Sequence, residues 1–183
     1  MEKDSSLLLE ILIIFILIIA NGIFAMTEIA IVSSRKARME KYAAGGSEGA
    51  MVALEFMAEP TALLSTVQIG ISLIGVVTGA YGGITIAQAL VIYLKPLPIV
   101  GPYAASASMA IVVSLITYAS LIIGELVPKR FALNNPEPIA IYIARPMRLL
   151  SRIFLPIVKL LSWSTELSLK VLGIKKPDND GVT

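Results

Sequence analysis

The 183-residue sequence contains neither cysteine nor histidine. Without cysteine there is no disulfide bond and no thiolate metal site, and without histidine there is no imidazole to serve as a base or a ligand. Nucleophile–base pairs built on either residue are excluded as well. Soft transition metals are disfavoured for the same reason, so the sequence directs attention to oxygen donors.

Charged residues are missing from three long stretches. Residues 11–27, 60–94 and 96–124 contain no Asp, Glu, Lys or Arg, and the chain is 56% hydrophobic with a mean hydropathy of +0.83. A soluble domain is usually about 45–50% apolar, whereas apolar runs of about 18 residues or more are typical of membrane spans. We therefore predict an all-α integral membrane protein with three spans, over residues 7–32, 60–94 and 104–127.

The first stretch does not have the pattern of a signal peptide. Signal peptides begin with a basic segment and have a short apolar core. Here the chain begins Glu2-Lys3-Asp4, which is net acidic, and the long apolar run carries Glu28 near its end. We expect it to be retained as the first helix.

The second stretch is too long for one straight span. Its 35 residues would make a helix of about 52 Å at 1.5 Å per residue, against a hydrocarbon core of about 30 Å. It must therefore tilt, bend or break, and its glycines mark where. Gly75, Gly79 and Gly83 recur every four residues. This spacing favours close helix packing, with the approach of a ligand as the alternative.

The polar segment between the first two spans is expected to be helical. Residues 33–59 predict a helical extension of the first span, a break at Gly45-Gly46 and a short helix opening at Ser47. Pro60 suits the first turn of the next helix, where its missing N–H has no consequence.

The distribution of basic residues predicts the orientation. Of the 15 Lys and Arg residues, only Lys3 and Lys95 lie on one side of the predicted spans, and the other 13 lie in residues 35–41 or after residue 127. The positive-inside rule places that larger group in the cytoplasm. We therefore predict a multi-pass protein of the inner (plasma) membrane, with its N-terminus outside and its C-terminus inside.

The C-terminal part reads differently from the spans. In residues 136–172, Arg145, Arg148, Arg152 and Lys159 recur at offsets of 3, 7 and 14, which is one helical face. This pattern predicts an amphipathic helix in the cytoplasmic headgroup region, bent by prolines, with a fourth span as the alternative. The polar residues 174–183 read as the start of a linker.

Two carboxylates interrupt the spans. Glu28 lies seven residues before Arg35, and Glu125 lies four before Lys129, so both are expected near the cytoplasmic boundary. Acidic side chains are costly in a bilayer and are functional by default. With no Lys or Arg inside the predicted spans, we expect a bound cation to neutralise them in a shared pocket. The alternatives are an ion pair of Glu125 with Lys129, and a Glu28 that reaches water or is protonated.

Proline chemistry adds a backbone ligand. Pro128 has no N–H, and its ring clashes with the carbonyl four residues back, which belongs to Gly124. A distorted helix would leave that oxygen free beside Glu125, and such oxygens bind hard cations such as Mg²⁺ or Na⁺. A proline that merely ends the helix is the alternative. Asn21 and Thr27 on the first span, and Ser72 on the second, supply further polar oxygens.

Five short motifs follow one another in a fixed order, over residues 21–30, 32–38, 63–70, 124–129 and 135–137. The most specific are Gly-Glu-x-x-Pro-Lys, beginning at Gly124, and the Asn-Pro-Glu that begins at Asn135. Together these motifs resemble the transmembrane domain of the CNNM/CorC family, including its haemolysin-C-like bacterial members. Two positions depart from the family pattern, because Ala25 and Gly75 stand where side-chain ligands are usual.

The resemblance implies a homodimer that transports Mg²⁺, by export coupled to Na⁺ entry. It implies a transmembrane domain over residues 1–173, with a juxtamembrane helical belt at 136–172, and a linker from 174 to cytoplasmic CBS domains that bind ATP. Its cation site would use Glu125, the Gly124 carbonyl and Glu28, with Ser72 replacing a family amide. Gly75 would lie at that site without a side chain to offer.

Three functions compete at this stage. The first is a secondary cation transporter, whose partners are Mg²⁺, membrane lipid and a second copy of the chain, and not nucleic acid. The second is a membrane anchor or regulatory scaffold for a CBS module, in which both carboxylates are structural. The third, an intramembrane enzyme, is disfavoured. No Asp lies in any span, so an aspartyl dyad is excluded, and a Ser–Lys pair would have to use Lys129, which lies at the boundary of the third span.

Overall fold

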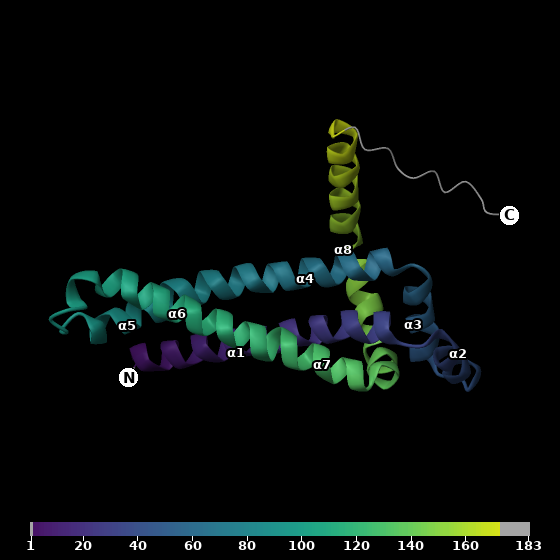
Figure 1. The fold of residues 1–183 in the computed structure, drawn as a ribbon, viewed down its shortest axis with the longest axis horizontal. Helices are drawn as coiled ribbons and strands as arrows, with labels where there is room; N and C mark the ends of the chain where they lie inside the picture. Colours follow the sequence, from purple (N-terminus) through teal and green to yellow (C-terminus); the bar gives the residue numbers. More distant parts are fainter. Residues whose placement is uncertain (1, 173–183) are drawn as a thin grey trace.

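The computed structural model describes residues 2–172, and every regular element in that range is helical. Three long segments run along the molecule, and α2, α3 and α8 gather at one end of them (Figure 1). The predicted linker over 174–183 lies outside the described residues. In chain order the elements are α1 (Glu2–Ser33), α2 (Lys36–Ala44), α3 (Glu48–Ala58), α4 (Pro60–Tyr81), the π-helical turn η1 (Gly82–Ile86), α5 (Ala87–Leu94), the 3-10 turn η2 (Gly101–Tyr103), α6 (Ala104–Leu121), the π-helical turn η3 (Ile122–Leu126), α7 (Val127–Asn134) and α8 (Pro136–Val171).

Three helical segments are long and apolar enough to cross a membrane, which confirms the predicted spans. They are Leu7–Ser33, Pro60–Leu94 and Gly101–Asn134. The third continues past its predicted end at Val127, because Pro128 does not stop the helix. The chain instead takes the π-helical turn η3 and continues as α7. The chain is thus a multi-pass membrane protein.

The second span is interrupted where its glycines cluster. At Gly82 and Gly83 the α-helix gives way to η1, and α5 then completes the crossing. A π-helical turn is rare and disturbs the regular hydrogen-bond ladder. The glycines therefore mark an irregular turn, as predicted, but the span does not break and stays helical from Pro60 to Leu94.

The polar connection agrees with prediction in part. The expected helical extension of the first span is wrong, because α1 ends at Ser33 and Arg35 is extended, so that α2 is a separate helix. The later part is confirmed: Ser47 caps α3 by accepting a hydrogen bond from the Ala50 amide at 3.3 Å, and α4 begins at Pro60.

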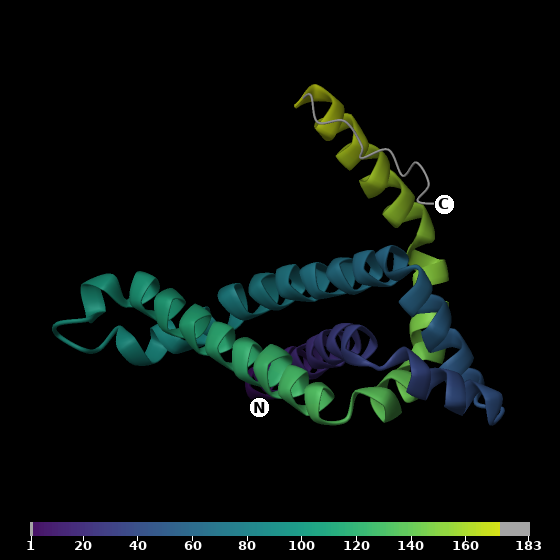
Figure 2. The same ribbon diagram turned by 45° about the vertical axis from the view of Figure 1, so that its right-hand side comes forward.

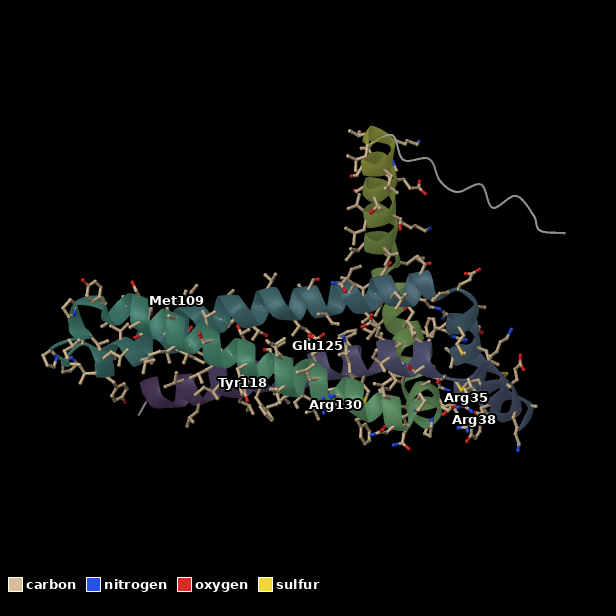
Figure 3. The ribbon with its side chains drawn as sticks, in the orientation of Figure 1. Arg35, Arg38, Met109, Tyr118, Glu125 and Arg130 are labelled. Atoms are coloured by element: carbon tan, nitrogen blue, oxygen red, sulfur yellow. The ribbon has the colours of Figure 1, made fainter. Side chains whose placement is uncertain are left out.

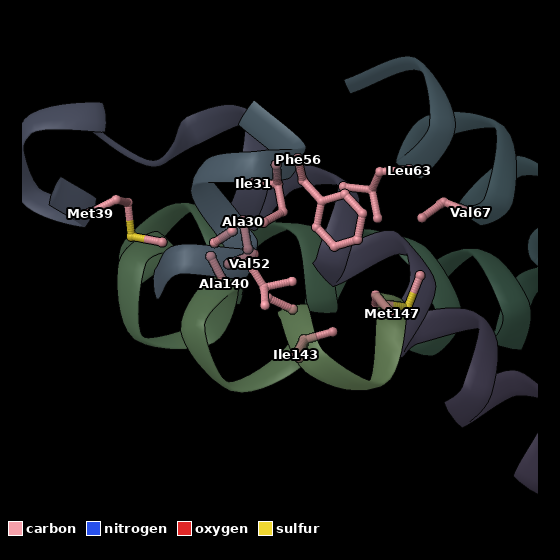
Figure 4. Close-up of a cluster of buried hydrophobic side chains, with 13 residues drawn as sticks. Ala30, Ile31, Met39, Val52, Phe56, Leu63, Val67, Ala140, Ile143 and Met147 are labelled. Atoms are coloured by element: carbon pink, nitrogen blue, oxygen red, sulfur yellow. The ribbon is translucent and has the colours of Figure 1, made fainter. Parts of the chain in front are cut away.

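The largest group of buried apolar side chains lies at the end of the bundle that carries α2, α3 and α8 (Figure 4). Phe56, Leu63 and Met147 come from three different helices and are almost inaccessible. Because this cluster joins the ends of α1 and α4 to α3 and α8, it holds the spans at one end. Its members are Ala30, Ile31, Met39, Val52, Ala53, Phe56, Leu63, Val67, Ala132, Ala140, Ile143, Ala144 and Met147.

The long helix α8 is amphipathic, as predicted. Its first half buries Ala140, Ala144 and Met147, while Arg145 and Arg148 form ion pairs with Glu48 and Glu55 of α3. Its second half leaves the bundle (Figure 2). Among the described helices α8 does not qualify as a membrane span by composition, so the fourth-span alternative is not supported. Its place in the headgroup region stays a prediction.

The spans are poorly covered by the chain itself. In the most apolar 18-residue stretch of each span, only 17% is buried in the first span, 28% in the second and 11% in the third. Val76 and Leu115 are 71% and 63% exposed. Apolar surface of this extent needs lipid or another protein chain against it.

The predicted orientation can be tested by labelling, because the chain has no native cysteine. Lys41 of α2 and Lys95 after α5 are exposed, and their helices lie at opposite ends of the bundle (Figure 1). In intact cells, a membrane-impermeant maleimide should label Lys95→Cys and leave Lys41→Cys unlabelled until the membrane is permeabilised. The opposite pattern would reverse the orientation.

Candidate functional site

A cavity of about 270 Å³ opens between the three spans. Its wall is mostly aliphatic, from residues such as Ile18, Ile74 and Ile116. The polar groups in the wall come from α1, α4, α6 and η3, and the glycines of the second span form part of the same wall. These polar residues are Asn21, Thr78, Thr117, Ser120 and Glu125.

The π-helical turn η3 positions the carboxylate of this cavity. The predicted distortion is present at Gly124 and Glu125, within four residues before Pro128. The Gly124 carbonyl is not left free, however, because the Asn21 side-chain amide donates a hydrogen bond to it at 2.9 Å. A carbonyl without a partner in a membrane is costly, and a neighbouring helix supplies the donor here. Two expected cation ligands therefore bind each other.

A glycine permits this contact between helices. A Cβ atom at Gly22 would lie 2.9 Å from Pro128 Cγ and 3.1 Å from the Ile123 carbonyl oxygen. Any larger residue would push α1 away from η3 and α7. The small residue thus keeps Asn21 within reach of the Gly124 carbonyl.

Glu28 and Glu125 come together on Lys129. The Lys129 Nζ lies 2.9 Å from Glu125 Oε1 and 3.8 Å from Glu28 Oε2. We call these three residues the carboxylate–lysine cluster. The expectation that the two carboxylates lack a cationic neighbour is wrong, because the third span continues through Pro128 and the lysine reaches back one helical turn. The predicted Glu125–Lys129 pair is present.

The cluster is partly open to its surroundings. The side chains of Lys129, Glu28 and Glu125 are 30%, 35% and 42% exposed. Glu125 lines the cavity, whereas Glu28 and Lys129 do not. Figure 3 places Glu125 between Tyr118 and Arg130 along the third span, on the way to the end of the bundle that carries Arg35 and Arg38. The cluster therefore adjoins the cavity through Glu125.

The other expected ligands are divided between the cavity and its exterior. Gly75 lines the cavity, but Thr27 and Ser72 do not. Thr27 is buried, and its hydroxyl donates a hydrogen bond to the Ile23 carbonyl of its own helix at 2.7 Å. Ser72 is exposed. Ala25, where a ligand hydroxyl is usual, is fully buried.

Two of the three regularly spaced glycines in the second span, Gly75 and Gly79, have a different role from the one expected. Gly83 does pack closely, because a Cβ atom there would lie 3.3 Å from Met109 Cε. Within the described chain, nothing lies within 4 Å of a Cβ placed at Gly75 or Gly79. Close packing of helices at these two positions is therefore not what the fold uses inside one chain. Because both line the cavity, the approach of a ligand is the better supported alternative.

Sequence reasoning missed Thr117 and Ser120 of α6. Their spacing from Gly124, at offsets of seven and four, is that of one helical face and was the available signal. Thr78 of α4 is another polar residue of this wall. It is 4% exposed, and its hydroxyl has no hydrogen-bond partner among the described residues. It lines the cavity, so a bound ligand or water would satisfy it.

The acidic groups of residues 2–172 do not form a cluster of three or more that would hold a metal ion by themselves. A cation at Glu125 would therefore depend on hydroxyl, amide and water oxygens for the rest of its coordination. Such oxygens are common ligands of hard cations.

Replacing Asn21 tests the link between α1 and η3. Asn21→Leu removes the donor to the Gly124 carbonyl and should lower the free energy of unfolding by about 1–3 kcal/mol, the cost of an unsatisfied buried acceptor. The measurement is a denaturant titration in detergent. Thr27→Val is the matched control, because the Ile23 carbonyl keeps its helical amide donor. An equal effect of both would contradict the role of Asn21.

Comparison with known proteins agrees with these features. The family model described as the cyclin M transmembrane N-terminal domain matches residues 12–183. UPF0053 protein sll0260 of Synechocystis sp. is 46% identical over 98% of this chain and 40% of its own length. The UPF0053 protein YhdT of Bacillus subtilis is 28% identical over 94% of this chain and 38% of its own.

A further relative has a name that states a function. The polyamine export protein of Haemophilus influenzae is 24% identical over 94% of this chain and 40% of its own length. The chain thus spans about two fifths of the curated relatives that it matches. The match over residues 12–183 confirms the resemblance carried by the Gly-Glu-x-x-Pro-Lys and Asn-Pro-Glu motifs, and the chain belongs to the CNNM family as its transmembrane domain.

Proposed function

We propose that the chain moves a cation across the membrane, and that Mg²⁺ is the cation. The observation that carries this proposal is Glu125, a carboxylate that lines a cavity of about 270 Å³ between the three spans. A carboxylate among membrane spans is costly, and such residues mark ion pathways. Membership of the CNNM family, and a relative named as an exporter, support transport.

The donors around Glu125 suit a hard cation. Asn21, Thr78 and Ser120 offer amide and hydroxyl oxygens in the same wall. Mg²⁺ prefers oxygen ligands, is usually held by one or two carboxylates, and keeps several of its waters. At about 30 Å³ per water molecule, the cavity has room for an ion with part of its hydration shell.

Further parts of the proposal concern the whole protein. We infer a homodimer, because the spans leave much apolar surface uncovered, and Na⁺ as the counter-ion of Mg²⁺ export. CBS domains that bind ATP would follow in the part of the relatives that this chain does not span. A scaffold without transport of its own remains the competing function, in which Glu125 only forms a structural ion pair with Lys129.

An organic polycation is the second candidate substrate. The cavity wall is mostly aliphatic, as a polyamine with its methylene chain would require. Moreover, Glu125 already holds a primary ammonium, the Lys129 Nζ at 2.9 Å. One relative is named a polyamine export protein.

Neutralising Glu125 tests transport. Glu125→Gln keeps the size of the side chain and removes its charge, so Mg²⁺ flux into proteoliposomes should fall at least about tenfold, the effect of losing about 1.4 kcal/mol. Glu40→Gln is the control, because Glu40 is exposed on α2 and makes no ion pair within the described chain. Wild-type flux in Glu125→Gln, with normal insertion, would favour the scaffold.

Ligand-dependent stabilisation separates the two substrates. If Mg²⁺ is the substrate, millimolar Mg²⁺ should raise the melting temperature of the purified protein, and spermidine at equal ionic strength should not. The shift with Mg²⁺ should disappear in Glu125→Gln. A shift with spermidine alone would replace Mg²⁺ by the polyamine, and no shift with either would count against transport.

A further inference from the structure

Lys129 occupies the position in which the proposed function needs a cation. It is bound to Glu125, the carboxylate of the cavity, and also to Glu28. We propose that Lys129 is a tethered counter-cation: its ammonium neutralises the two carboxylates when the site is empty, and the transported cation displaces it. This inference rests on the proposed function and concerns the regulation of the same site.

The geometry makes Glu125 a shared ligand. Its Oε1 lies 2.9 Å from Lys129 Nζ, while the residue also lines the cavity. A cation that enters the cavity and binds this carboxylate would come close to the ammonium. Two cations at one carboxylate repel each other, so binding of the ion weakens the contact of Glu125 with Lys129, and the lysine in turn competes with the ion.

The charge of the cluster explains why a tethered cation is useful. Glu28, Glu125 and Lys129 sum to one negative charge, and without the lysine the two carboxylates would carry two. An empty site with two uncompensated carboxylates is costly near the membrane and would hold a divalent cation tightly. The Lys129 ammonium reduces both effects. It stabilises the empty site, and it competes with the bound ion for Glu125, which promotes release of the ion.

The residue type and its surroundings suit a movable cation. Lysine carries a compact charge on a flexible four-carbon stem, and the Lys129 side chain is 30% exposed. Its contact with Glu28 is longer, at 3.8 Å. Glu28 lies on α1 and can therefore hold the ammonium after it leaves Glu125 on α6–η3–α7.

The adjacent basic residue provides a control for the position of the charge. Arg130 follows directly in α7 and is exposed, and within the described part of the chain it forms no ion pair. Figure 3 shows Arg130 beyond Glu125 along the third span, toward the end of the bundle that carries Arg35 and Arg38. Arg130→Met is therefore a matched control that removes one positive charge beside the cluster without removing the contact.

The test measures Mg²⁺ binding and Mg²⁺ transport in the same reconstituted protein. Lys129→Met should lower the Kd for Mg²⁺ about tenfold and slow release, so that the rate of turnover at saturating Mg²⁺ falls. Lys129→Arg should keep a Kd close to that of the wild type, because the charge is kept. Arg130→Met should change neither quantity. Lys129→Gln provides the neutral variant if the Met variant does not fold.

The outcomes separate this inference from the proposed function. If Lys129 were only structural, its neutral variants would bind Mg²⁺ more weakly or with an unchanged Kd, and either result would overturn the tethered cation. If Arg130→Met tightened binding equally, the effect would be one of general charge and the inference would fall. If the wild type bound no Mg²⁺ and Glu125→Gln changed nothing, the proposed function itself would fail.

Discussion

The hydrogen bond from the Asn21 side chain to the Gly124 carbonyl is the contact on which the arrangement of the site depends. Pro128 cannot continue the regular helical ladder, and within a membrane no water is available for a carbonyl that loses its donor. The helix forms the π-helical turn η3 at this point, and the Asn21 side chain of α1 donates the hydrogen bond to the Gly124 carbonyl. This turn places Glu125 at the cavity, and the helix that resumes after it places Lys129 within reach of both carboxylates.

The family motifs divide into residues of the site and residues that hold the fold. Glu137, from the Asn-Pro-Glu motif, is buried in the first turn of α8, and Arg38 reaches it at 3.4 Å. A carboxylate at a helix N-terminus is also stabilised by the helix dipole. This pair joins α2 to α8 beside the large apolar cluster. Motif residues outside the spans thus fix the end of the bundle from which α1 and the third span extend.

Much of the architecture could be predicted from the sequence because its causes are local. Charge-free runs predicted the spans, the glycines of the second span marked its irregular turn, and Ser47 and Pro60 marked helix starts. The partners of the polar groups could not be predicted in the same way. Thr117 and Ser120 have the right spacing, but nothing in the sequence around them indicates that their face lines a cavity rather than meeting lipid.

What the sequence alone determined is therefore the set of helices and the presence of two carboxylates within apolar segments. Hydrophobicity and proline chemistry act over a few residues, so composition and spacing reveal them. Only the tertiary structure decided that Gly124 is bound by Asn21 and that one lysine serves both Glu28 and Glu125. Those contacts depend on the rotation and depth of α1 against the third span, which packing at Gly22 and the apolar cluster sets.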